Sequence, residues 1–583
     1  MNSIRILWVI VFLCFANNKS FTQETTFIYY PNVLNGPSYD WISSIAVSQV
    51  NPQYRFLAGN AGECDIDPST ESLYLENWGG FVCKVASSGS LAWCFQLENT
   101  TLDDIQTDQE DNVYIVGEFY DQVDFDPSSA VVTRNTDGHD LFIAKYDSEG
   151  NFIWVIKLTA SDLSSITKIV NIRIWNNLLM VGGNFRETLV LSGTGSSNQP
   201  TLESNGNSDI FFAQYNLDGE LQQSITIGEF YEEKLLDFEI HITNIIASIN
   251  YENYTDIDPW SEQGEISTLT STSFIAEYDL LNDELLPETV WFNQYPTYCW
   301  INDIQLHPNG LSFYAAGGFT GILDFDPSII ENVGTSNGAQ DGFIVEYSIF
   351  QGQFLNLWTL GGIGDDRISF FRTYEIDGQI RSYIAGTIEE LVDVQFGEGS
   401  SNLFGINDLG DLFCCEYDQN MQLNWSKTIG LNGFATIYDM EIFQPFDPQT
   451  FVALNICGSY WGSANWSPNS VSPYITTSTD QINDGFDYWL MPFVTNSIDA
   501  YSEEFIRIYP NPVKDILFID LKGINSSNRA TVEIVNDLGC VVHRSQISEF
   551  ENQICTSNLE CGAYMLKLLI GDDYHHVMRF VKG

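Results

Sequence analysis

The sequence is poor in basic residues and in histidine, and both shortages restrict what the protein can contact. Its 583 residues include 23 Lys and Arg against 78 Asp and Glu, with 6 His. The imbalance lies mainly in residues 23–498, which hold 66 acidic and 13 basic residues. Such a surface repels phosphate backbones and anionic membranes, so we expect no nucleic-acid partner. Two interpretations of the charge stay open: solubility of an exported protein, or attraction of a cation or a cationic partner.

Motifs for catalysis and for zinc binding are also missing. No C-x-x-C pair occurs among the 11 Cys, and neither H-E-x-x-H nor G-x-S-x-G is present. Three histidines, His139, His241 and His307, stand far apart in the chain, and we expect His139 and His307 to face solvent in loops. No spacing singles out a pair of carboxylates of the glycosidase type. We therefore expect no enzymatic activity, with an extracellular hydrolase acting on polysaccharide as the alternative.

Only one long apolar run occurs, and it lies at the start of the chain. Arg5 precedes an apolar stretch at residues 6–16, the arrangement of a secretion signal, so residues 1–22 are predicted to be a signal peptide. The stretch is too short to span a bilayer stably. Since no other run of 18 apolar residues exists, we expect no integral membrane span in the mature chain.

Helix-length apolar periodicity is absent as well, and short β-branched and aromatic runs take its place. The clearest example covers residues 112–158, which read NVYIVGEF, then a D-F-D-P segment, then DLFIAKY and FIWVIKL. With a short run at 104–107, these form four strands joined by turns. The pattern predicts one small antiparallel sheet.

This unit recurs along the chain, and the recurrence predicts the fold. First strands are expected near residues 43, 104, 168, 237, 303, 371 and 439, at spacings of 61 to 69 residues. Four-stranded sheets must stack to bury both faces, so we predict an all-β, seven-bladed β-propeller over residues 24–498. The seventh unit lacks a fourth strand, and residues 27–33 are expected to supply it by pairing near 488–493. A glycine closes the second strand of most units: Gly59, Gly117, Gly182, Gly317, Gly386 and Gly458.

The repeated pattern also resembles a known family. A strand ending in Gly and an aromatic residue, D-F-D-P, G-x-D-Φ-F-Φ-A-x-Y and G-N-x-x-W are similar to the bacterial β-propeller repeats called SBBP repeats. The resemblance covers residues 27–498 and is strongest in the second and fifth units. It implies a propeller fold and no shared activity.

Residues 499–583 follow a polar boundary and are predicted to form a small antiparallel β-sandwich. The segment closely resembles the type A C-terminal sorting domain of the Bacteroidetes type IX secretion system. That resemblance implies the secretion machinery as a partner, removal of the domain after export, and release of the protein or its attachment at the cell surface. The residues that match the sorting motif are Tyr509, Pro510, Asn511, Pro512, Gly539, Gly562 and Tyr564.

The most frequent polar motif in the repeats is D-Φ-D-P, where Φ is apolar. In an extended segment both carboxylates would point the same way while Φ points into the core. Carboxylates of this kind are suitable calcium ligands, and no other cofactor is expected. The alternative, which we favour, is a turn in which each Asp accepts hydrogen bonds from backbone N–H groups. The candidate calcium ligands are Asp65, Asp67, Asp124, Asp126, Asp256, Asp258, Asp324 and Asp326.

Two further side-chain predictions follow from the strand pattern. Cys83 and Cys94 would face each other, and a disulfide would be feasible, only if the turn at 87–90 is a two-residue loop. Exposed aromatic residues such as Trp260, Trp461 and Trp466 are candidates for stacking on sugars, although packing between blades is the commoner use. The favoured function is a secreted or cell-surface binding or adhesion module that contacts an extracellular glycan or protein through its loops.

Overall fold

The computed structural model gives the fold over most of the chain. It describes residues 25–582 except 35–36, 68–72, 88, 162–165, 196–198, 243, 257–264, 269–270, 280–287, 296–297, 377, 397–400, 406–409, 444–451, 467–474, 479–482, 495–505, 510–512, 515, 522–529, 536–540, 548–552, 560–561 and 571–572. All regular elements in these residues are β-strands, and every paired strand runs antiparallel to its neighbour. The predicted signal peptide lies outside the described residues.

Four sheets of the repeat region contain four strands each, and in each sheet the strands lie side by side in chain order. They are β2 (Trp41–Val47), β3 (Tyr54–Ala61), β4 (Gly79–Ala86) and β5 (Leu91–Glu98); β10 (Lys168–Trp175), β11 (Leu178–Phe185), β14 (Asp209–Asn216) and β15 (Leu221–Ile227); β16 (Glu233–His241), β17 (Asn244–Tyr251), β20 (Thr272–Asp279) and β21 (Glu288–Gln294); and β22 (Cys299–Leu306), β23 (Ser312–Phe319), β26 (Asp341–Ser348) and β27 (Phe354–Leu360).

Two larger sheets contain the same four-stranded meander with additional strands. One joins β6 (Thr100–Thr107), β7 (Val113–Asp124), β8 (Thr133–Tyr146) and β9 (Phe152–Ala160) to β12 (Thr188–Val190) and β13 (Thr201–Glu203). The other joins β28 (Arg367–Ile376), β29 (Gln379–Ile388), β32 (Asp411–Tyr417) and the long β33 (Leu423–Phe443) to β34 (Ala453–Asn465), β35 (Ile475–Thr477), β36 (Asp484–Val494) and β1 (Thr25–Val33). Three small ribbons pair β18 (Tyr254–Asp256) with β19 (Glu265–Ser267), β24 (Ile322–Asp324) with β25 (Val333–Thr335), and β30 (Leu391–Asp393) with β31 (Asn402–Phe404).

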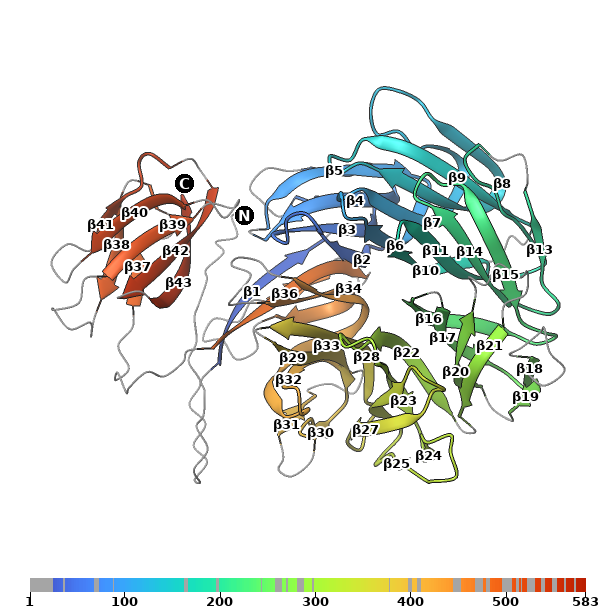
Figure 1. Cartoon of the computed structure of the whole chain (residues 1–583). Helices are drawn as coiled ribbons and strands as arrows, with labels where there is room; N and C mark the ends of the chain where they lie inside the picture. Colours follow the sequence, from blue (N-terminus) through green and yellow to red (C-terminus); the bar gives the residue numbers. More distant parts are fainter. Residues whose placement is uncertain are drawn as a thin grey trace.

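The first strands of the meanders contact one another in a closed cycle. The cycle runs through β2, β6, β10, β16, β22, β28 and β33, and β33 contacts β2 again. Figure 1 shows these strands turned toward the middle of the molecule, with the small ribbons at its outer edge. This is the arrangement of a β-propeller. Six of the first strands begin at the predicted residue or up to four residues before it, whereas β33 begins at Leu423 because it is continuous with the fourth strand of the sixth unit.

The closing strand predicted at residues 27–33 is present. β1 pairs antiparallel with β36, placing Phe27 opposite Pro492 and Val33 opposite Phe486. The two ends of the repeat region are thereby joined in one sheet by backbone hydrogen bonds. An open sheet edge at β36 would be a template for pairing with other chains, and β1 covers it.

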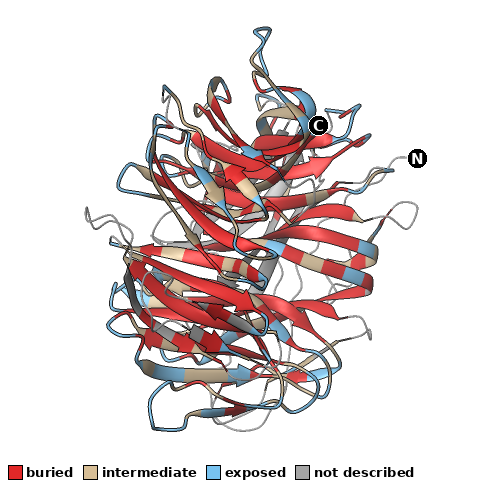
Figure 2. Cartoon of the chain, turned by 90° about the vertical axis from the view of Figure 1, so that its right-hand side faces the viewer, coloured by how far each residue is buried: buried red, intermediate tan, exposed pale blue. Residues whose placement is uncertain are grey.

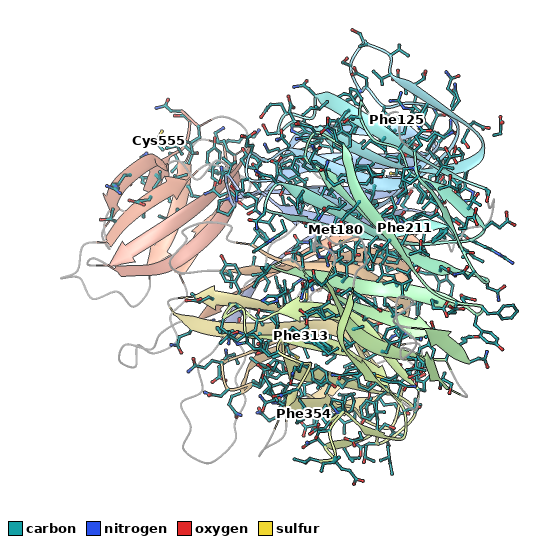
Figure 3. All side chains as sticks on the ribbon, turned by 45° about the vertical axis from the view of Figure 1, so that its right-hand side comes forward. Phe125, Met180, Phe211, Phe313, Phe354 and Cys555 are labelled. Carbon is teal, nitrogen blue, oxygen red and sulfur yellow. A yellow bond between two sulfur atoms is a disulfide. The ribbon has the colours of Figure 1, made fainter. Side chains whose placement is uncertain are left out.

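The hydrophobic core lies between neighbouring sheets rather than inside any one of them. Tyr114 on β7 and Ile143 on β8, for example, share a buried cluster with Ile172 on β10 and Phe211 on β14. Figure 2 shows the buried strand interiors and the exposed connections, and Figure 3 shows Phe125, Phe211 and Phe313 within the packed interior. Stacking therefore buries the faces that a single sheet would expose.

Every first strand carries a β-bulge at the same position, directly after a buried Ile or Leu. In six of the seven units a glycine of the second strand lies opposite the residue before the bulge, and in the fourth unit Ile249 takes this place. A Cβ on Gly117 would lie 1.9 Å from the carbonyl oxygen of Thr101, and one on Gly458 equally close to that of Thr436. The closing glycines thus allow a close approach of two backbones. The bulges fall between Ile42 and Ser44, Leu102 and Asp104, Ile169 and Asn171, Leu235 and Asp237, Ile301 and Asp303, Ile368 and Phe370, and Ile437 and Asp439.

The third unit departs from the sequence prediction by one residue. Gly183, not Gly182, lies opposite Ile169 before the bulge, where a Cβ would come 2.3 Å from the carbonyl oxygen of Lys168. Two adjacent glycines made the register ambiguous in the sequence.

The C-terminal region forms two sheets of its own. One contains β37 (Ile506–Tyr509), β38 (Ile516–Leu521) and β41 (Gln553–Cys555), and the other β40 (Val541–Ile547), β39 (Ala530–Val535), β42 (Gly562–Ile570) and β43 (Asp573–Lys582). Leu517, Ile519, Val532, Ile534 and Leu566 are fully buried and come from both sheets.

Candidate functional site

The densest group of interacting charged side chains in the described residues lies on the first strands, directly after the bulges. A bulge re-aims the side chain that follows it, and four of these positions hold aspartate. We call them the inner carboxylates; all are on strands that form the closed cycle. They are Asp104 on β6, Asp237 on β16, Asp303 on β22 and Asp439 on β33.

Each inner carboxylate accepts a hydrogen bond from the backbone of the next sheet in the cycle. The N–H of Ile172 donates to Asp104 Oδ2 over 2.8 Å, and the N–H of Ile304 donates to Asp237 Oδ2 over the same distance. The N–H of Phe371 donates to Asp303 Oδ2 over 2.7 Å, and that of Ile45 donates to Asp439 Oδ2 over 2.8 Å. A bulge leaves a backbone N–H without its ladder partner, and these carboxylates supply one.

Two arginines lie among the inner carboxylates. Arg173 on β10 bonds Asp237 at 2.9 Å and Glu239 at 3.0 Å. Arg372 on β28 bonds Asp303 at 2.8 Å and lies 3.6 Å from both Asp439 and Glu441. Charge-assisted pairs of this kind need partners on every side when they are buried, because an unpaired charge there is costly.

Burial dominates the ionisation of this group. It raises the pKa of Asp104 to about 6, although Arg173 and the N–H of Ile172 favour the charged form. It also raises the pKa values of Asp303 and Glu441, against the effect of Arg372. Asp103, the bulged residue itself, has its pKa raised to about 8 by burial and by Glu118, and its Oδ2 atom has no hydrogen-bond partner.

The inner carboxylates and the two arginines form a structural link between neighbouring sheets. Each carboxylate is held by a neighbouring backbone or guanidinium, which leaves few free lone pairs for a substrate. No group of three or more His, Cys, Asp or Glu side chains placed to hold one metal ion occurs in the described residues. The sequence analysis missed the inner carboxylates, although Asp104, Asp237, Asp303 and Asp439 stand at the same place in their repeats.

The D-Φ-D-P segments lie in the connections between second and third strands. Asp124 Oδ1 accepts hydrogen bonds from the N–H groups of Asp126 (3.2 Å) and Val132 (2.8 Å). Phe125 between the two acids is fully buried, and its carbonyl accepts a bond from Tyr146 Oη at 2.8 Å. The alternation of side chains is as predicted, and the hydrogen bonds are those of the turn interpretation.

The same bonds recur in the other units. Asp65 Oδ1 accepts from the N–H groups of Asp67 and Leu73, and Asp324 Oδ1 from those of Asp326 and Asn332, at 2.9 to 3.1 Å. Asp326 also accepts the side-chain amide of Asn332 at 2.7 Å. Asp256 is the last residue of β18, and Asp258 lies outside the described residues.

Two predictions of solvent exposure, those for Trp466 and His139, are wrong. Trp466 is fully buried, because it occupies the Φ position of the seventh D-Φ-D-P segment, and Tyr488 Oη donates to its carbonyl at 3.1 Å. His139 is also buried, in the middle of the long β8 and opposite Tyr120, with its ring near that of Tyr120. His307 is half-buried, and Trp461 is exposed as predicted. Trp260 lies outside the described residues.

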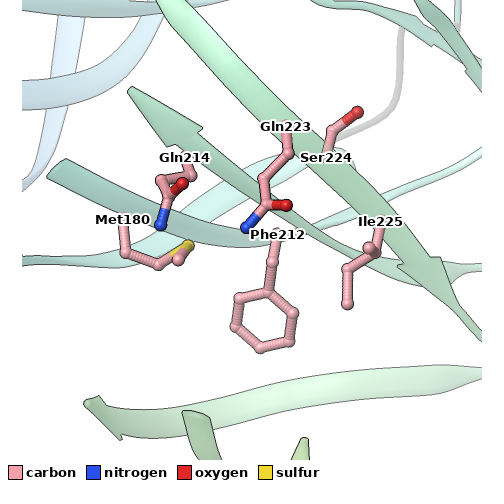
Figure 4. A pocket seen from close by; sticks show the side chains of 6 residues that line it. All are labelled: Met180, Phe212, Gln214, Gln223, Ser224 and Ile225. Atoms are coloured by element: carbon pink, nitrogen blue, oxygen red, sulfur yellow. The ribbon is translucent and has the colours of Figure 1, made fainter. Parts of the chain in front are cut away.

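A small hollow, with a cavity volume of about 10 Å³, lies on the sheet that contains β10 and β15. Figure 4 shows Met180, Phe212 and Gln214 on one side of it and Gln223, Ser224 and Ile225 on the other. Sites for drug-sized molecules have volumes of roughly 300–1,000 Å³, so this hollow is too small for such a ligand.

Cys83 on β4 lies directly opposite Cys94 on β5, and the two form a disulfide. A bulge between Lys84 and Val85 sets this register. The bond links two neighbouring strands of one sheet. Disulfides form and persist in oxidising compartments.

Three of the sorting-motif residues lie in the described part of the two C-terminal sheets. Tyr509 ends β37 opposite Phe518, Gly562 begins β42 opposite Lys582, and Tyr564 is buried. Pro510, Asn511, Pro512 and Gly539 lie outside the described residues. No helix in the described residues is long and apolar enough to cross a membrane.

Comparison with known proteins adds little to the repeat region. An uncharacterized WD repeat-containing protein of Acanthamoeba polyphaga mimivirus is 28% identical over 149 residues, which is 23% of this chain and 11% of that protein. The chain therefore spans about a tenth of the length of this curated relative. Among solved structures, Sqt1 from Chaetomium thermophilum is 10% identical with a TM-score of 0.36, covering 73% of this chain and 97% of that one. The Dos1 propeller (11% identical, TM-score 0.33, 79% and 94% covered) and Drosophila Semaphorin 2a (10%, 0.36, 94% and 96%) are similarly distant.

The C-terminal region gives a specific match. Residues 507–582 match the family described as the secretion system C-terminal sorting domain. This range contains β37 to β43 and the motif residues identified from the sequence. The chain therefore ends in a sorting domain of the type IX secretion system, and the protein is an exported one that is secreted or displayed at the cell surface.

Proposed function

We propose that this protein binds an extracellular glycan or protein without catalysing a reaction, through loops at one end of a seven-bladed propeller. Residues 24–498 would form the ring, of the SBBP repeat type, and residues 499–583 a small β-sandwich that is removed after export. The closed cycle of first strands and the β1–β36 pairing support this reading of the ring. Residues 1–22 would direct the chain out of the cytoplasm.

One observation carries the binding proposal: exposed aromatic side chains are concentrated at one end of the sheets. In an antiparallel meander, the connections from second to third strand and from fourth strand to the next sheet leave from the same end. Only Trp175 and Phe350 among the exposed aromatic residues of the described regions lie at the opposite end. The residues at the first end are Tyr39, Tyr74, Trp78, Tyr120, Phe230, Tyr231, Tyr298, Phe434 and Trp461, whereas Tyr438 is exposed at the bulge within β33.

Aromatic side chains in such positions are suited to recognition. Tyr and Trp offer a rigid apolar surface with a polar tip, and they are enriched where proteins bind partners. Phe434 on β33 and Trp461 on β34 are cross-strand partners and both are exposed, so they form a continuous aromatic surface. Loops carried by a rigid scaffold are also where binding residues are commonly found.

The test compares the two ends of the sheets. The purified chain would be applied to a glycan array and to candidate extracellular proteins, and the soluble products of polysaccharides would be measured in parallel. We expect binding without product release. The double variant F434A/W461A should weaken binding at least tenfold, whereas W175A/F350A at the opposite end should not.

Two results would count against the proposal. Equal loss of binding in both double variants would show that the aromatic end is not the contact surface. Steady product formation, abolished by substitution of one carboxylate, would favour the hydrolase alternative instead.

A further inference from the structure

A buried acidic position recurs at the start of the third strands. In the sheet register, Asp140 on β8, Asp209 on β14 and Asp341 on β26 occupy the same place, two residues before an aromatic core residue. All three are nearly or fully buried. Each accepts a backbone N–H: that of Ala160, Asn205 or Asn337 respectively, at 2.9 to 3.0 Å. One N–H group does not compensate a full buried charge.

At Asp140 the compensation comes from a lysine. Lys157 Nζ lies 2.5 Å from Asp140 Oδ2. Lys157 stands on the fourth strand of its sheet, opposite Phe142. The corresponding residues are Thr226, opposite Phe211, and Thr359, opposite Phe343. Asp209 and Asp341 therefore have no lysine at this place.

In the two units that lack this lysine, a second buried carboxylate lies next to the first. Glu233 is the first residue of β16 and is fully buried, and its N–H donates to the carbonyl of Ser208, the neighbour of Asp209, at 2.9 Å. Asp366, also fully buried, makes the equivalent bond to Gln340, the neighbour of Asp341, at 2.8 Å. The matching residue after the Lys157-containing sheet is Thr167, which is neutral.

At the junction between β14 and β16, the buried oxygens Asp209 Oδ1 and Glu233 Oε1 have no hydrogen-bond partner. The hydroxyl group of Thr255 lies beside Glu233 and favours its charged form, and it has no other hydrogen-bond partner. All three residues are fully buried. Burial raises the pKa values of Asp209 and Glu233 to about 7; the charge of Glu229 adds to the effect on both, and that of Asp209 adds to it on Glu233. The charged groups that act on Asp209 and Glu233 are therefore acids, and none of them is a counter-charge.

We propose that Asp209, Glu233 and Thr255 bind a calcium ion at the junction of the β10–β15 and β16–β21 sheets. Carboxylate and hydroxyl oxygens are hard ligands that favour Ca²⁺ over transition metals. Two carboxylates match its double charge. Mg²⁺ is disfavoured because it retains several waters, for which a fully buried site has little room.

The ion would do at this junction what Lys157 does at the preceding one. It would neutralise the acid of the third strand and hold the following sheet against it, so that stability depends on calcium. The proposed carboxylate ligands are not those of the D-Φ-D-P segments, where Asp65, Asp124 and Asp324 already accept two backbone N–H groups each. Thr255 directly precedes Asp256, the first acid of the fourth unit's D-Φ-D-P segment. The Asp341–Asp366 pair is the related arrangement, where Asp341 Oδ1 also has no partner.

The test uses the full chain and two double variants. D209N/E233Q removes both charges, whereas T226K/E233T transplants the lysine arrangement of the preceding junction. Unfolding temperatures would be measured at pH 8 in a chelator and in excess CaCl₂, and the number of bound calcium ions by titration calorimetry. For the unmodified chain we expect calcium to raise the unfolding temperature by several degrees.

In T226K/E233T we expect an unfolding temperature in chelator close to that of the unmodified chain with calcium, and one bound ion fewer per chain. D209N/E233Q should also lose one ion. Unchanged stoichiometry in both variants would overturn the proposal, since the ions would then lie elsewhere. So would a difference between unmodified and variant chains that depends on pH between 5 and 8 but not on calcium, because the pair would then share a proton. T226K/E233T keeps the test decisive if D209N/E233Q does not fold.

Discussion

The carboxylate of Asp303 on β22 accepts hydrogen bonds from both the backbone N–H of Phe371 and the guanidinium of Arg372 on β28. One side chain thus joins two neighbouring sheets through a backbone group and a charge. The same backbone bond is made by Asp104, Asp237 and Asp439 to the sheets that follow them. On four of the seven first strands the bulge thus precedes an inward-facing acid, which accepts a backbone N–H of the next first strand in the cycle.

Removing one of these acids should destabilise the ring. D303A leaves the N–H of Phe371 and the buried Arg372 with reduced compensation, and breaking a buried pair costs about 3–5 kcal/mol. We expect a clear decrease in the urea midpoint of unfolding, followed by circular dichroism. E110A removes an exposed carboxyl and serves as the control, with little change expected. A D303A midpoint equal to that of E110A would show that the inner carboxylates do not hold the sheets together.

A second prediction concerns pH. Burial raises the pKa of Asp103 to about 8 and that of Asp104 to about 6, so the folded chain retains protons that the unfolded chain releases. The stabilisation is complete below the unfolded pKa of about 4 and is lost as the pH rises through the folded values. We expect the unfolding temperature to decrease between pH 5 and pH 9.

The variant D103N makes this prediction specific. An amide does not titrate, so the pH dependence should become shallower and the variant should be more stable than the unmodified chain at pH 9. E149Q, which changes an exposed carboxyl, should follow the unmodified curve. Identical curves for all three chains would mean that Asp103 is not the group that takes up the proton.

The sequence predicted some of these features and missed others for identifiable reasons. The pairing of 27–33 with the last sheet was predictable because one strand was missing from a regular repeat, and it is present. The bulges were not predictable from the sequence. One extra residue in a first strand leaves its apolar run within the range of lengths that the repeats already show. Without the bulges, the side-chain directions of Asp103 and Asp104 cannot be assigned.

Errors at single residues have the same origin. Trp466 was predicted to be exposed, yet in the seventh unit's N-W-S-P version of the D-Φ-D-P segment it fills the buried Φ position. The buried carboxylates Asp209 and Glu233 are 24 positions apart in the chain and meet only where two sheets stack. Contacts of this kind depend on tertiary packing and leave no local signal.

The D-Φ-D-P segments allow a third prediction. Asp124 Oδ1 accepts two backbone N–H groups, and an asparagine retains that oxygen while an alanine does not. We expect D124N/D126N to change the unfolding temperature little and D124A/D126A to lower it. The differences from the unmodified chain should be equal in chelator and in calcium. A loss in D124N/D126N that occurs only with calcium would show that these carboxylates bind the ion.

A fourth prediction concerns closure of the ring. A chain that begins after Val33 lacks β1 and leaves the edge of β36 unpaired. We expect a lower unfolding temperature and self-association, measured by calorimetry and by light scattering, because an open edge pairs with other chains. A chain that begins at Thr25 is the control and should remain monomeric and stable. Equal behaviour of the two chains would mean that β1 is dispensable.

The last prediction concerns export. Residues 507–582 match a sorting domain, so the secretion machinery must recognise this segment while the repeat region passes as cargo. Material recovered from the medium or the cell surface should begin after about residue 22 and end near residue 500, as measured by intact mass. A chain lacking 499–583 should accumulate in the periplasm, because the remaining sheets carry no second sorting segment that we identify. The full chain, which retains 499–583, is the control and should be exported. An exported form that still contains the whole of 499–583 would refute the removal step, and export of the truncated chain would refute the role of the domain itself.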